Sequence, residues 1–270
     1  MSNLNEKNNE MLENIIEENE SSEYMSIPVT VLGEKDPKLM SREEFETSPE
    51  LLYHGCSKQI KFENDFDYNS KEYLTNNDGS TTLGFGFYAV DNRDAAKSYS
   101  KQRQNDLESK EENVVSVLPY NARMLDFRQE KNSNKNIPVS KEFALEWREY
   151  FNEYLNKRSE REGNVGEMFN QFENEYLKYL DRVLDLKDST LRVLLRTEAS
   201  LELKSGSAPS PLWSSLFSKF VIEKGSDGII YNEKVEGSDN ICTSYVFYNL
   251  KKIGTYNSWH KRDSLNQNPT

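Results

Sequence analysis

Short apolar runs bounded by turn-forming residues occupy the first half of the chain and its last quarter. Runs of this length and spacing are typical of buried strands. They predict strands at residues 27–32, 51–55, 84–90, 114–118, 122–127, 228–231, 243–249 and 253–256, with a turn at Tyr120 and Asn121.

Between residues 140 and 199 the apolar period changes to three and four residues, which indicates helices. Phe143, Trp147, Tyr150 and Tyr154 follow this spacing. A second aromatic set follows the capping-box sequence at 164–167, namely Phe169, Phe172, Tyr176, Tyr179 and Val183. The pattern predicts a helical insertion at 140–204 whose aromatic stripes form core packing. Strands that flank a helical insertion indicate an α+β fold.

Polar residues mark the expected helix starts and domain limits. Ser41 and Glu44 form a capping box, and Asp91 is the expected N-cap of a helix that includes Tyr99. The expected domain covers residues 26–257, followed by a polar, loose tail at 258–270. Residues 1–25 contain seven acidic residues and one lysine. They are interpreted as a flexible acidic tail, with a partner-binding or autoinhibitory helix as the alternative.

Composition narrows the class of protein. In 270 residues, 46 acidic and 34 basic side chains give a net charge of −12, which disfavours duplex nucleic acid as a partner. Cys56 and Cys242 cannot form a disulfide framework, and two histidines provide little material for a metal site. We expect no metal, no membrane span and no signal peptide. The expected location is the cytoplasm, or a host cell reached by secretion without a signal peptide.

Two segments contain the candidate chemistry. The first is Tyr53-His54-Gly55, where an imidazole precedes a bare backbone that a flat ligand can approach. The second runs from Gly84 to Tyr88 as Gly-Phe-Gly-Phe-Tyr, with Tyr99 eleven residues later on the following helix. Each residue alone is an ordinary core residue. Together they predict a cleft in which two aromatic faces and a His-Gly edge meet.

These segments resemble the ADP-ribosyltransferase superfamily, in the histidine-tyrosine-glutamate branch that includes diphtheria toxin and the poly-ADP-ribose polymerases. The resemblance covers about residues 45–130 and 210–257 and implies a split antiparallel sheet with NAD as co-substrate. It implies that His54 binds the adenosine ribose and that the Gly55 backbone pairs with the nicotinamide carboxamide. It also implies that Tyr88 and Tyr99 enclose the nicotinamide ring, a flat cation that aromatic faces attract.

The chain departs from this family pattern at two positions. Ser244 stands where the resemblance places the catalytic glutamate, and Ala96 stands where polymerases commonly have a serine. Ser244 remains among the expected NAD-binding residues. The acids near the last strands that can replace the glutamate are Asp227, Glu233, Glu236 and Asp239. Glu236 is the predicted catalytic acid, and His54 and Tyr88 are the other predicted catalytic residues.

The resemblance implies an NAD-dependent mono-ADP-ribosyltransferase that modifies a protein, with the helical insertion helping to select the target. The composition is compatible with a bacterial effector or toxin. One alternative is a transferase that acts on a small molecule such as an antibiotic. Another is a module that binds NAD or ADP-ribose without turnover, since Ser244 is not an acid. A third is an interaction protein whose helical insertion is the working part.

Overall fold

The computed structural model describes residues 27–56, 83, 86–104, 113–128, 139–162, 177–178, 180–181, 211–235 and 240–266. The strands are β1 (Val29–Leu32), β2 (Leu52–Cys56), β3 (Phe87–Val90), β4 (Asn113–Pro119), β5 (Ala122–Asp126), β6 (Gly228–Lys234), β7 (Ile241–Phe247) and β8 (Ile253–Gly254). The helices are α2 (Arg42–Glu46), α4 (Arg93–Gln104), α5 (Lys141–Glu162), α9 (Pro211–Glu223) and α10 (Tyr256–Asn266), with short 3-10 turns η1 (Pro37–Leu39) and η3 (Leu250–Lys252).

The eight strands form one sheet in the order β1-β5-β6-β7-β3-β2-β4-β8. Every neighbouring pair is antiparallel except β5 and β6, which run parallel. The expected α+β class is therefore confirmed, and the expected strands are found with small shifts at their ends. β2 and β3 share one registered pair, Tyr53 with Val90, whereas five pairs join β2 to β4.

A tight turn forces this sheet to curve. Tyr120 and Asn121 alone connect β4 to β5, although five places separate these strands in the sheet order. Asn121 has φ 44°, in the left-handed region that asparagine tolerates better than most residues. Two strands so far apart in the order can be joined by two residues only if the sheet bends back on itself.

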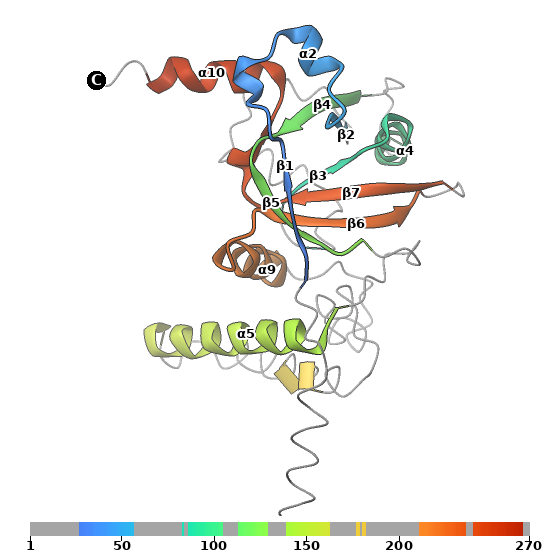
Figure 1. The fold of residues 1–270 in the computed structure, drawn as a ribbon. Helices are drawn as coiled ribbons and strands as arrows, with labels where there is room; N and C mark the ends of the chain where they lie inside the picture. Colours follow the sequence, from blue (N-terminus) through green and yellow to red (C-terminus); the bar gives the residue numbers. More distant parts are fainter. Residues whose placement is uncertain are drawn as a thin grey trace, which may run out of the picture.

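One face of the sheet is covered by helices, and we call it the helix-covered face. α4 packs on β2, β3 and β4, while α9 packs on β6 and α5 packs on α9 (Figure 1). Beneath α5 and α9 lies a buried aromatic and aliphatic cluster that includes Leu125, Phe143, Trp147, Phe151, Phe217, Phe220, Ile229, Val246 and Tyr248.

The start of the helical insertion is therefore part of the main core. Trp147 is fully buried, and its ring centroid lies 5.4 Å from those of Phe217 and Phe220 on α9. This confirms that the first aromatic stripe forms core packing. Of the second stripe at 169–183, only fragments at 177–178 and 180–181 are described, and the rest lies outside the described residues, as do residues 1–25.

The opposite face, which we call the inner face, has its own core. It is built from Leu52, Phe87, Ala89, Val117, Ala122, Met124, Ile230, Tyr245, Phe247 and Ile253. Successive residues of a strand point to opposite faces, so the register decides which side chains meet on each side. The position of each candidate site residue follows from this alternation.

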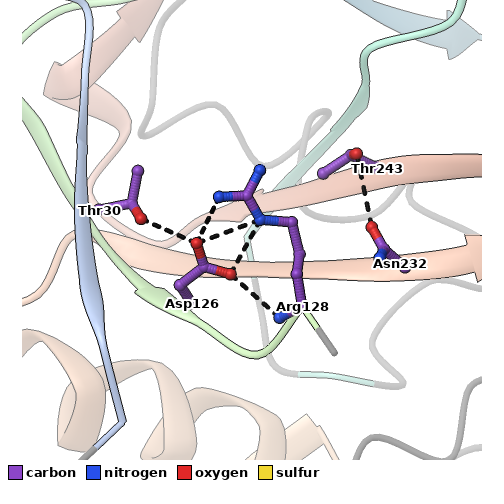
Figure 2. Close-up of polar contacts among 5 residues, drawn as sticks. All are labelled: Thr30, Asp126, Arg128, Asn232 and Thr243. Atoms are coloured by element: carbon purple, nitrogen blue, oxygen red, sulfur yellow. Dashed lines mark hydrogen bonds and ion pairs between the residues drawn. The ribbon is translucent and has the colours of Figure 1, made fainter. Parts of the chain in front are cut away.

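Polar contacts hold the edge strand β1 in place. The Thr30 hydroxyl donates to Asp126 on β5 at 2.8 Å, and the Arg128 guanidinium pairs with the same carboxylate (Figure 2). Figure 2 also shows Thr243 of β7 donating to Asn232 of β6. These contacts connect the outer strands to the centre of the sheet.

Ser41 caps α2 as the sequence predicts. Its hydroxyl accepts from the Glu44 amide at 3.2 Å, and the Glu44 carboxylate accepts from the Ser41 amide at 2.8 Å. The cap expected for α4, however, was wrong. Asn92 accepts from the amides of Asp94 and Ala95, whereas Asp91 accepts from the Thr243 amide on β7. A contact with a distant strand removes Asp91 from the capping role.

The C-terminal segment also differs from the expectation of a loose tail at 258–270. Residues Tyr256–Asn266 form α10, and Trp259 is buried against Met40, Phe45 and Leu118. The Trp259 indole donates to the Leu118 carbonyl at 3.2 Å. Trp259 is the main anchor of this polar helix, because Trp buries a large apolar area and its N–H finds a partner, and Tyr256 packs beside Phe45 in the same cluster.

Candidate functional site

Gly55 lies where β2 meets α4 at close range. A Cβ atom at Gly55 would lie 2.1 Å from the Ala96 carbonyl oxygen and 2.9 Å from the Ser100 amide. The helix backbone therefore occupies the side-chain position, and one strand edge already pairs with Val114 of β4. Gly55 has no registered partner on β3, so the edge that faces β3 is where we expect a ligand to approach its backbone. Ala96 is fully buried in the same contact, which explains a small residue there.

His54 occupies the inner face at the point where β2 and β3 diverge. Its ring centroid lies 4.6 Å from that of Phe87, and its Nδ1 atom lies 2.6 Å from the Tyr88 carbonyl oxygen. A carbonyl can only accept, so Nδ1 bears the proton in this contact. In the neutral ring Nε2 is then an acceptor, to which a ribose hydroxyl can donate.

Tyr88 lies on the helix-covered face in β3. Its hydroxyl accepts from the Leu83 amide at 3.2 Å, while Tyr248 donates to the Leu83 carbonyl. Leu83 precedes the two-glycine segment, and its backbone is thus tied to two tyrosines. Gly84 and Phe85 lie outside the described residues. The ring of Tyr88 packs half-buried against the core beneath α5 and α9.

Tyr99 reaches from α4 to a buried carboxylate on β6. The Tyr99 hydroxyl donates to Glu233 Oε1 at 2.7 Å, and the Ser244 hydroxyl on β7 donates to the same oxygen. Glu233 and Ser244 are only 6% and 2% exposed. Three elements therefore meet at one carboxylate, and we call Tyr99, Tyr231, Glu233 and Ser244 the carboxylate cluster.

Tyr231 completes this cluster beside Ser244, its registered partner on β7. Burial is the largest cause that raises the pKa of Tyr231 well above its usual value, and the negative charge of Glu233 is the next. The charges of Tyr88 and Tyr99 also raise this pKa. A hydrogen bond with Ser244 has the opposite, smaller effect on this pKa. Tyr231 is therefore a neutral hydroxyl located near both tyrosines of the glycine-tyrosine motif.

Cys242 borders the same cluster. Burial is the largest cause that raises the pKa of Cys242 to about 12, and the negative charge of Glu233 is the next. The thiol is 3% exposed and packs beside Val90, Ala95 and Val235. Such a cysteine is a small apolar residue rather than a nucleophile.

The structure brings part of the predicted site together. Tyr88, Tyr99 and Ser244 share the helix-covered face, whereas the His54 side chain lies on the inner face and is connected to Tyr88 through its carbonyl. The predicted acid Glu236 lies outside the described residues. The acid found beside Ser244 is Glu233, which the sequence offers as one of four choices. The alternation Tyr231-Asn232-Glu233 is the signal that places it on the face of Tyr231.

A cavity of about 560 Å³ lies away from all of these residues. It is lined by β1, β5 and α5, and includes Val29, Leu125 and Phe143. The ion pair between Glu146 and Lys224 borders it. None of the predicted site residues lines this cavity. The cavity is therefore not part of the candidate site.

Within the described ranges, no group of three or more His, Cys, Asp or Glu side chains is arranged to hold a metal ion. In the same part of the chain, no helix combines the length and the apolar character needed to cross a membrane. The chain matches no protein-family model, no curated protein and no solved structure.

Proposed function

We propose that this protein is an NAD-dependent mono-ADP-ribosyltransferase. The observation that supports the proposal is that Tyr88 and Tyr99 lie on one face of the sheet, where Ser244 of β7 and Tyr231 of β6 lie beside them. These tyrosines belong to the motif that resembles the histidine-tyrosine-glutamate transferases. Their aromatic faces suit oxidised nicotinamide, which is flat and positively charged.

The surroundings of His54 and Gly55 support the same ligand. The proton on His54 Nδ1 leaves Nε2 as an acceptor for a ribose hydroxyl. We propose that the Gly55 backbone pairs with the nicotinamide carboxamide, since a peptide N–H and C=O match the acceptor and donor of a primary carboxamide. His54 and Gly55 lie at the divergence of β2 and β3, one and two residues after the Tyr53–Val90 pair.

We propose a protein side chain as the acceptor. α5 packs on α9 through Trp147, so this helix offers a surface on the same body as the site. Its exposed side includes Leu145, which is 38% exposed. A small-molecule acceptor such as an antibiotic is the alternative outcome of the acceptor assay.

The test is incubation of the full chain with NAD labelled in the adenylate part. Nicotinamide release and the transfer of label to protein are then measured separately. His54→Ala and Tyr88→Ala should each abolish release while the protein remains folded by circular dichroism. His260→Ala and Tyr154→Ala are matched controls on α10 and α5 and should keep the parent rate. Unchanged release by the first two variants would refute the proposal.

The identity of Ser244 favours a second candidate, a module that binds NAD or ADP-ribose without turnover. A serine cannot stabilise a cation as a carboxylate does. Calorimetry with NAD and with ADP-ribose separates the two functions. Binding without nicotinamide release supports the module, whereas release with labelling supports the enzyme.

A further inference from the structure

Glu233 lies diagonally across from Ser244 on the adjacent strand. Ser244 is registered with Tyr231, so Glu233 is two residues further along β6 on the same face. Diagonal neighbours have Cα atoms about 7–8 Å apart, within reach of a long side chain. The contact between the Ser244 hydroxyl and Glu233 Oε1 shows that the Glu233 carboxylate lies over position 244.

The two oxygens of this carboxylate are in different situations. Oε1 accepts from Tyr99 and from Ser244, while no residue in the described part of the chain donates to Oε2. The side chain is 6% exposed. A buried carboxylate oxygen that lacks a donor is costly, and native proteins rarely keep one without a ligand, water or functional reason.

We infer that Glu233 is the acid that stabilises the transition state in this enzyme, in place of a glutamate at position 244. The inference rests on the proposed transferase function. It assigns the carboxylate to β6 instead of β7, with Ser244 and Tyr99 as positioning residues that hold Oε1. Oε2 is then the atom directed at the reacting sugar.

The reaction defines what this carboxylate does. The bond between C1′ of the ribose and the nicotinamide nitrogen breaks, and its electron pair leaves with neutral nicotinamide. The sugar becomes an oxocarbenium ion. The acceptor then forms the new bond to C1′ with its own electron pair and releases its proton to solvent or a base. Positive charge on the sugar is greatest in the transition state, so a fixed carboxylate stabilises that state more than bound NAD.

Tyr99 links the acid to the proposed ring site. Its ring is one of the two proposed to enclose nicotinamide, and its hydroxyl is 2.7 Å from Glu233 Oε1. The carboxylate thus lies at the edge of the ring site, where the ribose is attached. Two hydrogen bonds fix the group before substrate arrives, and such preorganisation avoids a reorganisation cost during the reaction.

A structural role makes a different prediction. In that case Glu233 only connects α4 to β6 and β7, and its charge is not needed. Glu233→Gln separates the two roles, because the amide oxygen can still accept from Tyr99 and Ser244. The matched control is Glu43→Gln, which makes the same change at an exposed acid on α2.

The experiment measures single-turnover nicotinamide release and NAD affinity for the full-length variants. We expect Glu233→Gln to slow release by about 100- to 1000-fold, the usual effect of removing one group that stabilises developing charge. NAD affinity and the melting temperature should change little, and Glu43→Gln should keep the parent rate. An active parent whose Glu233→Gln variant keeps its rate overturns the assignment and leaves the transferase function standing. A parent chain that neither binds nor cleaves NAD overturns both.

A rescue experiment keeps the test decisive if Glu233→Gln folds poorly. The double variant Glu233→Ser with Ser244→Glu moves the carboxylate across to β7, and it should regain most of the lost rate. Tyr99→Phe removes one donor to Oε1 and should lower the rate of release more than it weakens NAD binding. A double variant as inactive as Glu233→Ser, with the parent melting temperature, would overturn the proposal.

Discussion

Gly55→Ala tests whether the close contact between β2 and α4 sets the position of the site. The added Cβ would lie 2.1 Å from the Ala96 carbonyl oxygen, whereas ordinary contact begins at 3.4 Å. The helix must therefore retreat by about 1 Å, because both partners are backbone atoms that cannot rotate away. Tyr99 is on the same helix, and its 2.7 Å hydrogen bond to Glu233 would stretch beyond hydrogen-bond distance.

The cost can be worked from these contacts. Overpacking a dense contact typically costs about 1–3 kcal/mol, and a hydrogen bond to a charged group contributes about 1.5–3 kcal/mol. Because a stretched hydrogen bond loses only part of its energy, we expect the free energy of unfolding to fall by about 2–4 kcal/mol in total. A domain of ordinary stability stays folded under this loss.

Urea unfolding gives the change in free energy, and hydrogen exchange of α4 peptides reports the helix displacement. The control is Gly225→Ala, where φ is 79° and no atom lies within 4 Å of the added Cβ. It should cost about 1–2 kcal/mol through left-handed strain alone and leave exchange in α4 unchanged. If Gly55→Ala unfolds within about 0.5 kcal/mol of the parent and α4 exchanges as before, the reasoning is refuted.

Three further predictions concern the core, a helix start and a thiol. Trp147→Ala should cost about 3–5 kcal/mol in urea unfolding because it leaves a cavity between α5 and α9, whereas exposed Leu145→Ala should cost far less. A hydrogen bond from Lys35 is the largest cause that lowers the pKa of Glu44 from 4.5 to about 2, and hydrogen bonds from Ser41 are the next. Its contribution to stability is therefore complete above pH 4.5 and is lost as the pH falls toward 2; an NMR titration should show this midpoint, and Lys35→Ala should raise it. Cys242, with a pKa of about 12, should resist iodoacetamide at pH 8 until the protein is unfolded, and rapid labelling of the folded chain would contradict its burial.

The sequence alone determined the features that depend on a few neighbouring residues. The Ser41 capping box was predicted because both hydrogen bonds lie within four residues. The apolar runs located the strands, and the spacing of Phe143, Trp147 and Tyr150 located α5, because side-chain periodicity reports local geometry directly. The α+β class followed from these elements.

Only the tertiary structure decided which distant groups meet. Asp91 has the chemistry of an N-cap, yet the Thr243 amide of β7 takes its carboxylate and leaves the cap to Asn92. The polar composition of the last residues concealed the aromatic contacts of Trp259 and Tyr256 that dock α10.

The same limit applies to the site. The sequence offers four acids near the last strands and favours Glu236, whereas the β6–β7 register places Glu233 beside Ser244. Likewise, Gly55 suggests an open backbone, and the position of α4 shows that a helix fills most of that space. Capping and periodicity are decided by neighbours along the chain, whereas strand order and register are decided by the packing of the whole core.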